Sequence, residues 1–170
     1  MILLPRLKLR SPPLRLQLPK AVVVLLPLAL RLFMGGVFVY AGFSKLLEPI
    51  ENFRGIIAQY EVIPYQFVGV IAMALPWMEF IGGALLIAGY LPRQTAMMLG
   101  LLSLGFLVVL GSSHLLLGNA PVNCGCFGEN SWIKLSVRQV FLLDITNLAA
   151  GFYLYSKKDH FLSLDSVLKK

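Results

Sequence analysis

Two cysteines, Cys124 and Cys126, are the residues whose type and spacing could do chemistry. They stand in the run Asn-Cys-Gly-Cys-Phe-Gly at residues 123–128, and the 170-residue sequence has no other cysteine, so any intramolecular disulfide joins these two. Gly125 gives the backbone the freedom that so small a ring needs. A short loop constrains little of the unfolded chain, and strained, exposed disulfides are the more easily reduced ones. The pattern therefore favours reversible thiol–disulfide exchange.

Three other interpretations of the pair stay open: a static disulfide, metal binding and inert thiols. A structural zinc site takes four ligands, and only His114 is predicted to lie near the cysteines, so no metal site is expected. His114 precedes them by a few residues. It could favour the thiolate or move a proton, or it could simply be an interfacial histidine that is hydrogen-bonded to a neighbour.

The sequence that carries the cysteines is mostly apolar. It is 58% hydrophobic and 14% charged, with a mean hydropathy of +0.78, whereas soluble domains are nearer half apolar and a quarter charged. Four solid apolar blocks, at about 21–44, 65–89, 95–117 and 135–155, are each long enough to cross a bilayer core of ~30 Å as a helix. The chain is therefore predicted to be an all-α membrane protein with a bundle of four transmembrane helices.

Basic residues set the predicted orientation. Ten Lys and Arg residues fall on one side of the four blocks, and three fall on the other, which are Lys45, Arg54 and Lys134. The positive-inside rule then places both termini in the cytoplasm and the first and third connections in the periplasm, across a bacterial inner membrane. Residues 1–20 form a basic cytoplasmic arm, residues 21–156 the membrane domain and residues 157–170 a tail. The expected partner of the cations is the lipid bilayer rather than nucleic acid, for which no motif is present.

The first outer connection, Leu46–Pro64, is predicted to contain a short amphipathic helix. Phe53, Ile56, Ile57 and Tyr60 recur at helical spacing with polar residues between them. Such a helix would lie in the outer interface and either pack on the bundle or serve as a lid.

Packing signals elsewhere predict how the blocks meet. The second connection, 90–94, is so short that the second and third spans must form an antiparallel hairpin. Pro76 is expected to kink the second span, and Ser136 to cap the fourth. Small residues allow two helices to approach closely, and the candidates are Gly35, Gly36, Gly82 and Gly83.

Three charges lie inside the predicted spans: Arg31, Glu79 and Asp144. Such residues are costly in lipid and are expected to face the bundle interior in pairs. Counted from the outer ends of their spans, Arg31 and Glu79 lie at nearly equal depth, roughly 21–23 Å inward. This predicts an Arg31–Glu79 pair, for structure or for proton relay, and it leaves Asp144 to find a partner on another span.

Taken together, these stretches resemble the DoxX-like superfamily and, within it, the methylamine utilisation protein MauE family. The resemblance rests on Arg31-Leu32-Phe33, Phe38 to Lys45, Tyr60 with Ile63-Pro64, Leu75-Pro76-Trp77 with Glu79, Gly82-Gly83 and Cys124-Gly125-Cys126-Phe127-Gly128. It implies a four-helix membrane bundle that takes part in maturing periplasmic redox enzymes of the methylamine dehydrogenase type. It also implies two partners, a periplasmic thioredoxin-like protein and a secreted redox-enzyme client. The long basic N-terminal arm departs from the family pattern.

The leading hypothesis is a membrane-embedded thiol–disulfide oxidoreductase that works through Cys124 and Cys126. Electrons would pass to or from a membrane quinone, although no quinone-binding motif is visible in the sequence. A rival hypothesis is a non-enzymatic assembly or scaffold factor whose cysteines only shape the outer loop. A small-solute transporter that uses the three intramembrane charges ranks last.

Overall fold

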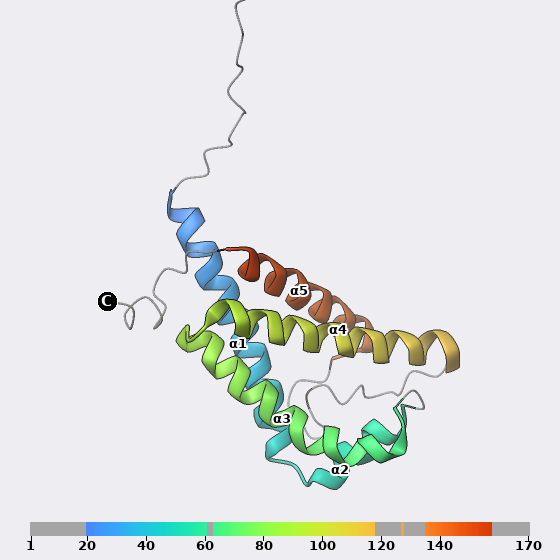
Figure 1. The fold of residues 1–170 in the computed structure, drawn as a ribbon. Helices are drawn as coiled ribbons and strands as arrows, with labels where there is room; N and C mark the ends of the chain where they lie inside the picture. The colour runs from blue at the N-terminus through green and yellow to red at the C-terminus, as the bar shows by residue number, and fades with distance from the viewer. Residues whose placement is uncertain (1–19, 61–62, 118–126, 128–134, 158–170) are drawn as a thin grey trace, which may run out of the picture.

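The computed structural model describes residues 20–60, 63–117, 127 and 135–157, and within them the chain forms five α-helices (Figure 1). They are α1 (Lys20–Leu46), α2 (Ile50–Ala58), α3 (Tyr65–Ala88), α4 (Pro92–Leu117) and α5 (Val137–Ser156). The four long helices match the four predicted spans to within a few residues at each end. The short helix α2 lies inside the first predicted outer connection.

Helices α3 and α4 form the predicted antiparallel hairpin. Gly89 ends α3 with φ 74°, and Leu91 follows with φ 44°, so two left-handed residues reverse the chain within three positions. The N–H groups of Gly89 and Tyr90 donate to the carbonyls of Leu86 and Leu85, which the end of a helix would otherwise leave unpaired. Pro92 then begins α4 at the position where its missing N–H removes nothing.

The bundle consists of two antiparallel helix pairs, α1 with α3 and α4 with α5. The α3–α4 turn joins the pairs at one end of the molecule, and from there α3 and α4 diverge (Figure 1). Helix α2 lies near the open end, where it packs on α3 through Phe53 and Ile57. The amphipathic helix is thus confirmed, and it packs on the bundle.

Glycines let α1 and α3 approach each other closely. A Cβ at Gly83 would lie 2.7 Å from the carbonyl oxygen of Gly35, and one at Gly42 would lie 2.7 Å from the carbonyl oxygen of Pro76. The neighbouring Gly82 instead faces Met98 and Leu99 of α4. The two consecutive glycines of α3 therefore serve two different partner helices, whereas Gly36 has no such neighbour within 4 Å.

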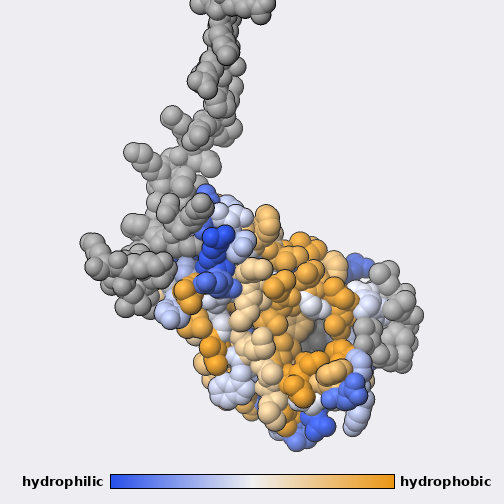
Figure 2. Space-filling view, in the orientation of Figure 1, coloured by the Kyte–Doolittle hydropathy of each residue, from blue (hydrophilic) through white to orange (hydrophobic). Residues whose placement is uncertain are grey.

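By length and composition, three stretches of the described residues can each cross a membrane: Leu25–Leu46, Tyr65–Ala88 and Pro92–Ser113. The chain is thus a multi-pass membrane protein. Its outward surface agrees, because large apolar side chains such as Val70, Ile81 and Leu101 are exposed along these helices, and the face in Figure 2 is largely apolar.

Helix α5 is less apolar on average than the other long helices because it carries polar residues on the side that faces the bundle. Asp144 and Asn147 are buried and face the bundle, while Phe141, Leu142 and Phe152 are exposed on the other side. Ser136 precedes the helix as its N-cap and shares a reciprocal hydrogen-bonding arrangement with Gln139, as predicted for this position.

Candidate functional site

The centre of the candidate site is a buried ion pair between α1 and α3. Lys45 Nζ donates to Glu79 Oε2 at 2.7 Å, and both side chains are at most 1% exposed. The ammonium also lies 5.5 Å and 5.8 Å from the ring centroids of Phe53 and Phe106. A charge in this setting is held by its partner and by two aromatic faces rather than by water.

The predicted Arg31–Glu79 pair is therefore wrong, since the partner of Glu79 is Lys45. The depth count assumed that the C-terminal end of α1 and the N-terminal end of α3 lie at the same depth in the membrane. In the structure the first two turns of α3 extend past the end of α1, and they pack on α2 through Val68 and Ala72. Because of this offset, Glu79 lies near the C-terminal end of α1, where Lys45 stands.

Arg31 instead closes the far end of α3. It is 1% exposed, and its guanidinium donates to the carbonyl oxygens of Leu86 and Ile87, each at 3.2 Å. These carbonyls belong to the last turn of α3, which carries the negative end of the helix dipole, and the Leu86 carbonyl also accepts from the N–H of Gly89. Arg31 thus ties the N-terminal half of α1 to the end of α3.

A small polar cavity lies beside the ion pair. It has about 20 Å³, roughly the room of one water molecule, and Glu79, Asp144 and Asn147 all line it. Asp144 of α5 thus lines the same cavity as Glu79 of α3, but Glu79 is another carboxylate, so the expected pairing of Asp144 with a partner on another helix stays a prediction. Among the described residues, Asn147 Oδ1 has no hydrogen-bond partner, so the cavity keeps an open acceptor.

Phe127 also lines this cavity, and it is the residue that follows Cys126 in the chain. Its side chain is 8% exposed, and its ring centroid lies 5.8 Å from that of Tyr40 on α1. The interior of the bundle therefore holds the C-terminal neighbour of the cysteine pair.

The cysteines themselves, Cys124 and Cys126, lie outside the described residues. His114 belongs to the last turn of α4, but its side chain is not among those described. Within the described part of the chain, no group of three or more His, Cys, Asp and Glu side chains could hold a metal ion.

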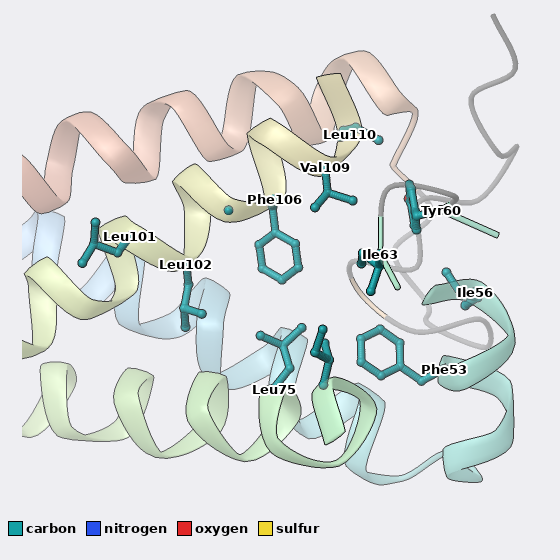
Figure 3. Close-up of a pocket in the computed structure, with 12 residues that line it drawn as sticks. Phe53, Ile56, Tyr60, Ile63, Leu75, Leu101, Leu102, Phe106, Val109 and Leu110 are labelled. Carbon is teal, nitrogen blue, oxygen red and sulfur yellow. The ribbon is translucent and has the colours of Figure 1, made fainter. Parts of the chain in front are cut away.

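A larger, apolar pocket opens between α2, α3 and α4, and the Phe106 ring is part of its lining. It has a volume of about 220 Å³ and is lined by three aromatic rings, those of Phe53, Tyr60 and Phe106, and by aliphatic residues of α3 and α4 (Figure 3). Figure 2 shows the hollow on the apolar face of the molecule. Phe106 lines both this pocket and the small polar cavity.

Comparison with known proteins places the chain in a family. The model of the methylamine utilisation protein MauE family matches residues 23–155, which is most of the sequence. The chain belongs to the MauE family. It is also 33% identical over 128 residues to the methylamine utilization protein MauE of Paracoccus denitrificans, a match that covers 72% of this chain and 68% of that relative. No solved structure matches the chain.

Membership in the MauE family confirms the resemblance to that family drawn from the sequence motifs, while the wider DoxX-like superfamily stays a prediction. Of the three intramembrane charges, the structure brings Glu79 and Asp144 to one cavity and places Arg31 elsewhere. Sequence reasoning missed Lys45, which it treated as a loop-side cation. The glycine contacts between α1 and α3 hold the register that brings Lys45 level with Glu79, but the spacing of the glycines in the sequence does not show which residues of the two helices meet.

Proposed function

We propose that this MauE family member exchanges thiols and disulfides through Cys124 and Cys126 and so supports the maturation of a periplasmic redox enzyme of the methylamine dehydrogenase type. The observation that carries the proposal is the burial of Phe127 beside two intramembrane carboxylates. Anchoring the residue next to Cys126 holds one end of the pair at the bundle, next to groups able to accept or release protons.

In the proposed reaction, a thiolate of the pair attacks a sulfur of a disulfide in a periplasmic thioredoxin-like partner. One S–S bond breaks, a mixed disulfide forms, and the leaving thiolate takes up a proton. The second cysteine then attacks the mixed disulfide and closes the Cys124–Cys126 disulfide, which releases the partner with both of its thiols reduced. The reverse sequence of steps oxidises the partner.

The topology that suits this chemistry has four spans, with α5 as the fourth, and both termini in the cytoplasm of a bacterial inner membrane. Helix α5 runs antiparallel along α4 and has an apolar outer face. Lys20, Arg93 and Lys157 stand at the end of the bundle that holds the α3–α4 turn. At the other end the exposed cations are Arg54 and Arg138. Across the sequence, ten Lys and Arg residues are predicted on the first side and three on the other, so the positive-inside rule favours a cytoplasmic α3–α4 turn.

The first experiment is trapping of the mixed disulfide. The full-length protein, in intact membranes, is mixed with a thioredoxin-like partner that keeps its attacking cysteine and has its resolving cysteine replaced by serine. We expect a disulfide-linked adduct that reducing agent dissolves. Its yield should fall at least tenfold in the Cys124→Ser/Cys126→Ser variant, because no sulfur remains to join the two proteins.

The rival proposal, a scaffold factor, predicts the opposite result. The redox proposal fails if two results are found together. The double cysteine variant supports maturation of the client enzyme as well as the wild-type chain does, and the wild-type chain forms no adduct with the partner. The control is Ser112→Ala, which removes a hydroxyl near the end of α4 that donates only to a carbonyl of its own helix. That variant should form the adduct normally.

A further inference from the structure

We propose that the pocket between α2, α3 and α4 binds the ring of a membrane quinone. The inference deepens the proposed function and rests on it only for the role of the quinone, which would be the electron acceptor of the cysteine pair. The binding site itself is argued from residues that the structure describes.

Access to the pocket is from the lipid. Its lining is apolar apart from the Tyr60 hydroxyl, and it opens on the apolar face formed by α3 and α4 (Figures 2 and 3). A ligand that enters here must already be dissolved in the bilayer. The volume of about 220 Å³ suits one substituted ring and the start of its tail, because an apolar cavity of about 150 Å³ is enough to hold benzene.

The shape and chemistry of the inner wall favour a flat ring over an acyl chain. The rings of Phe53 and Phe106 line the pocket from α2 and α4 and offer surfaces for stacking (Figure 3). An acyl chain would fill the same space, but it gains nothing from ring geometry. The aliphatic side chains around the mouth suit an isoprenoid tail that continues into the lipid.

A buried hydrogen-bond donor stands next to these two rings. Lys45 Nζ is the cation that lies 5.5 Å from the centroid of Phe53 and 5.8 Å from that of Phe106. An ammonium has three N–H donors, and among the described residues Glu79 is its one hydrogen-bond acceptor. Lys45 is not among the residues that line the pocket, so it acts on a ring bound against Phe53 and Phe106 through its charge, which favours the negative charge that develops on the quinone during reduction.

The redox step balances without any other reactant. Two thiol S–H bonds break and one S–S bond forms between the cysteines, and the two electrons and two protons that they release convert the quinone to its quinol. Phe127, the neighbour of Cys126, shares the small polar cavity with Phe106. Only one aromatic side chain therefore separates the anchor of the cysteine loop from the proposed quinone site.

The test uses the full chain in nanodiscs of quinone-free phospholipid and a benzoquinone with a photoreactive group on a short isoprenoid tail. We expect cross-links on α2 and α4 that excess unlabelled quinone removes and that a diacylglycerol of equal chain length leaves in place. Gly105→Phe should lower the labelling at least tenfold, because Gly105 lines the pocket and a side chain there meets no described atom within 4 Å. Gly111→Phe is the matched control, since it lies on the same helix, has the same open space and does not line the pocket.

Two results would overturn the quinone site: equal competition by diacylglycerol, or equal labelling of the Gly105→Phe and Gly111→Phe variants. Quinone binding is tested independently of thiol–disulfide exchange, because the Cys124→Ser/Cys126→Ser variant should bind the quinone probe as the wild-type chain does. If the quinone probe binds but no adduct with the partner forms, the proposed function fails and the quinone site is still supported. A partner adduct without quinone binding would do the reverse.

Discussion

At the scale of single residues, the main feature of the interior is the buried ion pair between Lys45 and Glu79. Both side chains are buried inside the protein, so each depends on the other for its charge. The carboxylate also borders the polar cavity, and the ammonium lies near the rings of Phe53 and Phe106, which line the apolar pocket. One ion pair therefore sits between the two spaces that the proposed chemistry uses.

Removing one member of this pair should cost far more than removing both. Lys45→Met leaves the Glu79 carboxylate buried without its cation, and we expect a loss of about 3 kcal/mol in the free energy of unfolding. Lys45→Met/Glu79→Leu should recover most of that loss, because no uncompensated charge remains. Unfolding by denaturing detergent in mixed micelles measures both variants.

The control for this comparison is Arg54→Met, which removes an exposed cation from α2 and should change the stability by less than about 0.5 kcal/mol. A double variant as unstable as Lys45→Met alone would show that packing around the two side chains, and not the uncompensated charge, explains the loss.

At the scale of helices, close contact between α1 and α3 positions Arg31, Lys45 and Glu79 relative to one another. Gly42 lies against the backbone of α3 at Pro76 and Phe80, and Gly83 lies against the backbone of α1 at Gly35 and Val39. Backbone atoms cannot rotate out of the way as side chains can. The register between the helices is therefore set firmly, and with it the height of Lys45 relative to Glu79.

The Gly42→Ala variant should disrupt this register. Its new methyl group would lie within 3 Å of the Pro76 carbonyl oxygen and the Phe80 nitrogen, so the helices must move apart. We expect a loss of about 1–3 kcal/mol, as is typical of overpacked sites. Gly36→Ala, on the same helix but with open space at the Cβ, should leave the thermal midpoint unchanged or slightly raised. Similar midpoints for the two variants would argue against a fixed α1–α3 contact.

Helix positions were predictable from the sequence because long apolar blocks, Gly89 and the N-cap Ser136 are local signals. The partner of Glu79 was not, because a depth count treats each span as starting at the same level. The offset arises from α2, which occupies the space beside the first turns of α3, and no local pattern encodes that placement. The apolar pocket escaped prediction for the same reason, since its walls come from α2, α3 and α4.

At the scale of the whole molecule, the two helix pairs form a wedge that is closed at the α3–α4 turn and open toward α2 (Figure 1). The closed end holds Arg31 and the basic residues Arg93 and Lys157, which stack on Tyr155 and Tyr153. The open end holds both cavities and the anchor residue Phe127. This division suits a protein with one face toward anionic headgroups and its chemistry toward the other side.

Single-cysteine labelling tests the proposed orientation. In the Cys124→Ser/Cys126→Ser background, a membrane-impermeant maleimide applied to cells with a permeabilised outer membrane should label Gln59→Cys and Ser136→Cys. It should not label Gln94→Cys or Ser156→Cys until the inner membrane is opened. All four positions are exposed in the structure, so access is set by the membrane and not by burial. Labelling of Ser136→Cys and Ser156→Cys from the same side would show that α5 does not cross.

The buried ion pair also has a consequence for how the chain is made. Lys45 is synthesised 34 residues before Glu79, and it stands one residue from the end of α1. A lysine near a helix end can keep its ammonium at the membrane surface, whereas a carboxylate in the middle of α3 has no such escape. Lys45 is therefore synthesised before Glu79, so a counter-ion for the acid is already part of the nascent chain when α3 enters the bilayer. The order of the two residues along the chain spares the insertion machinery from releasing an unneutralised acid into lipid.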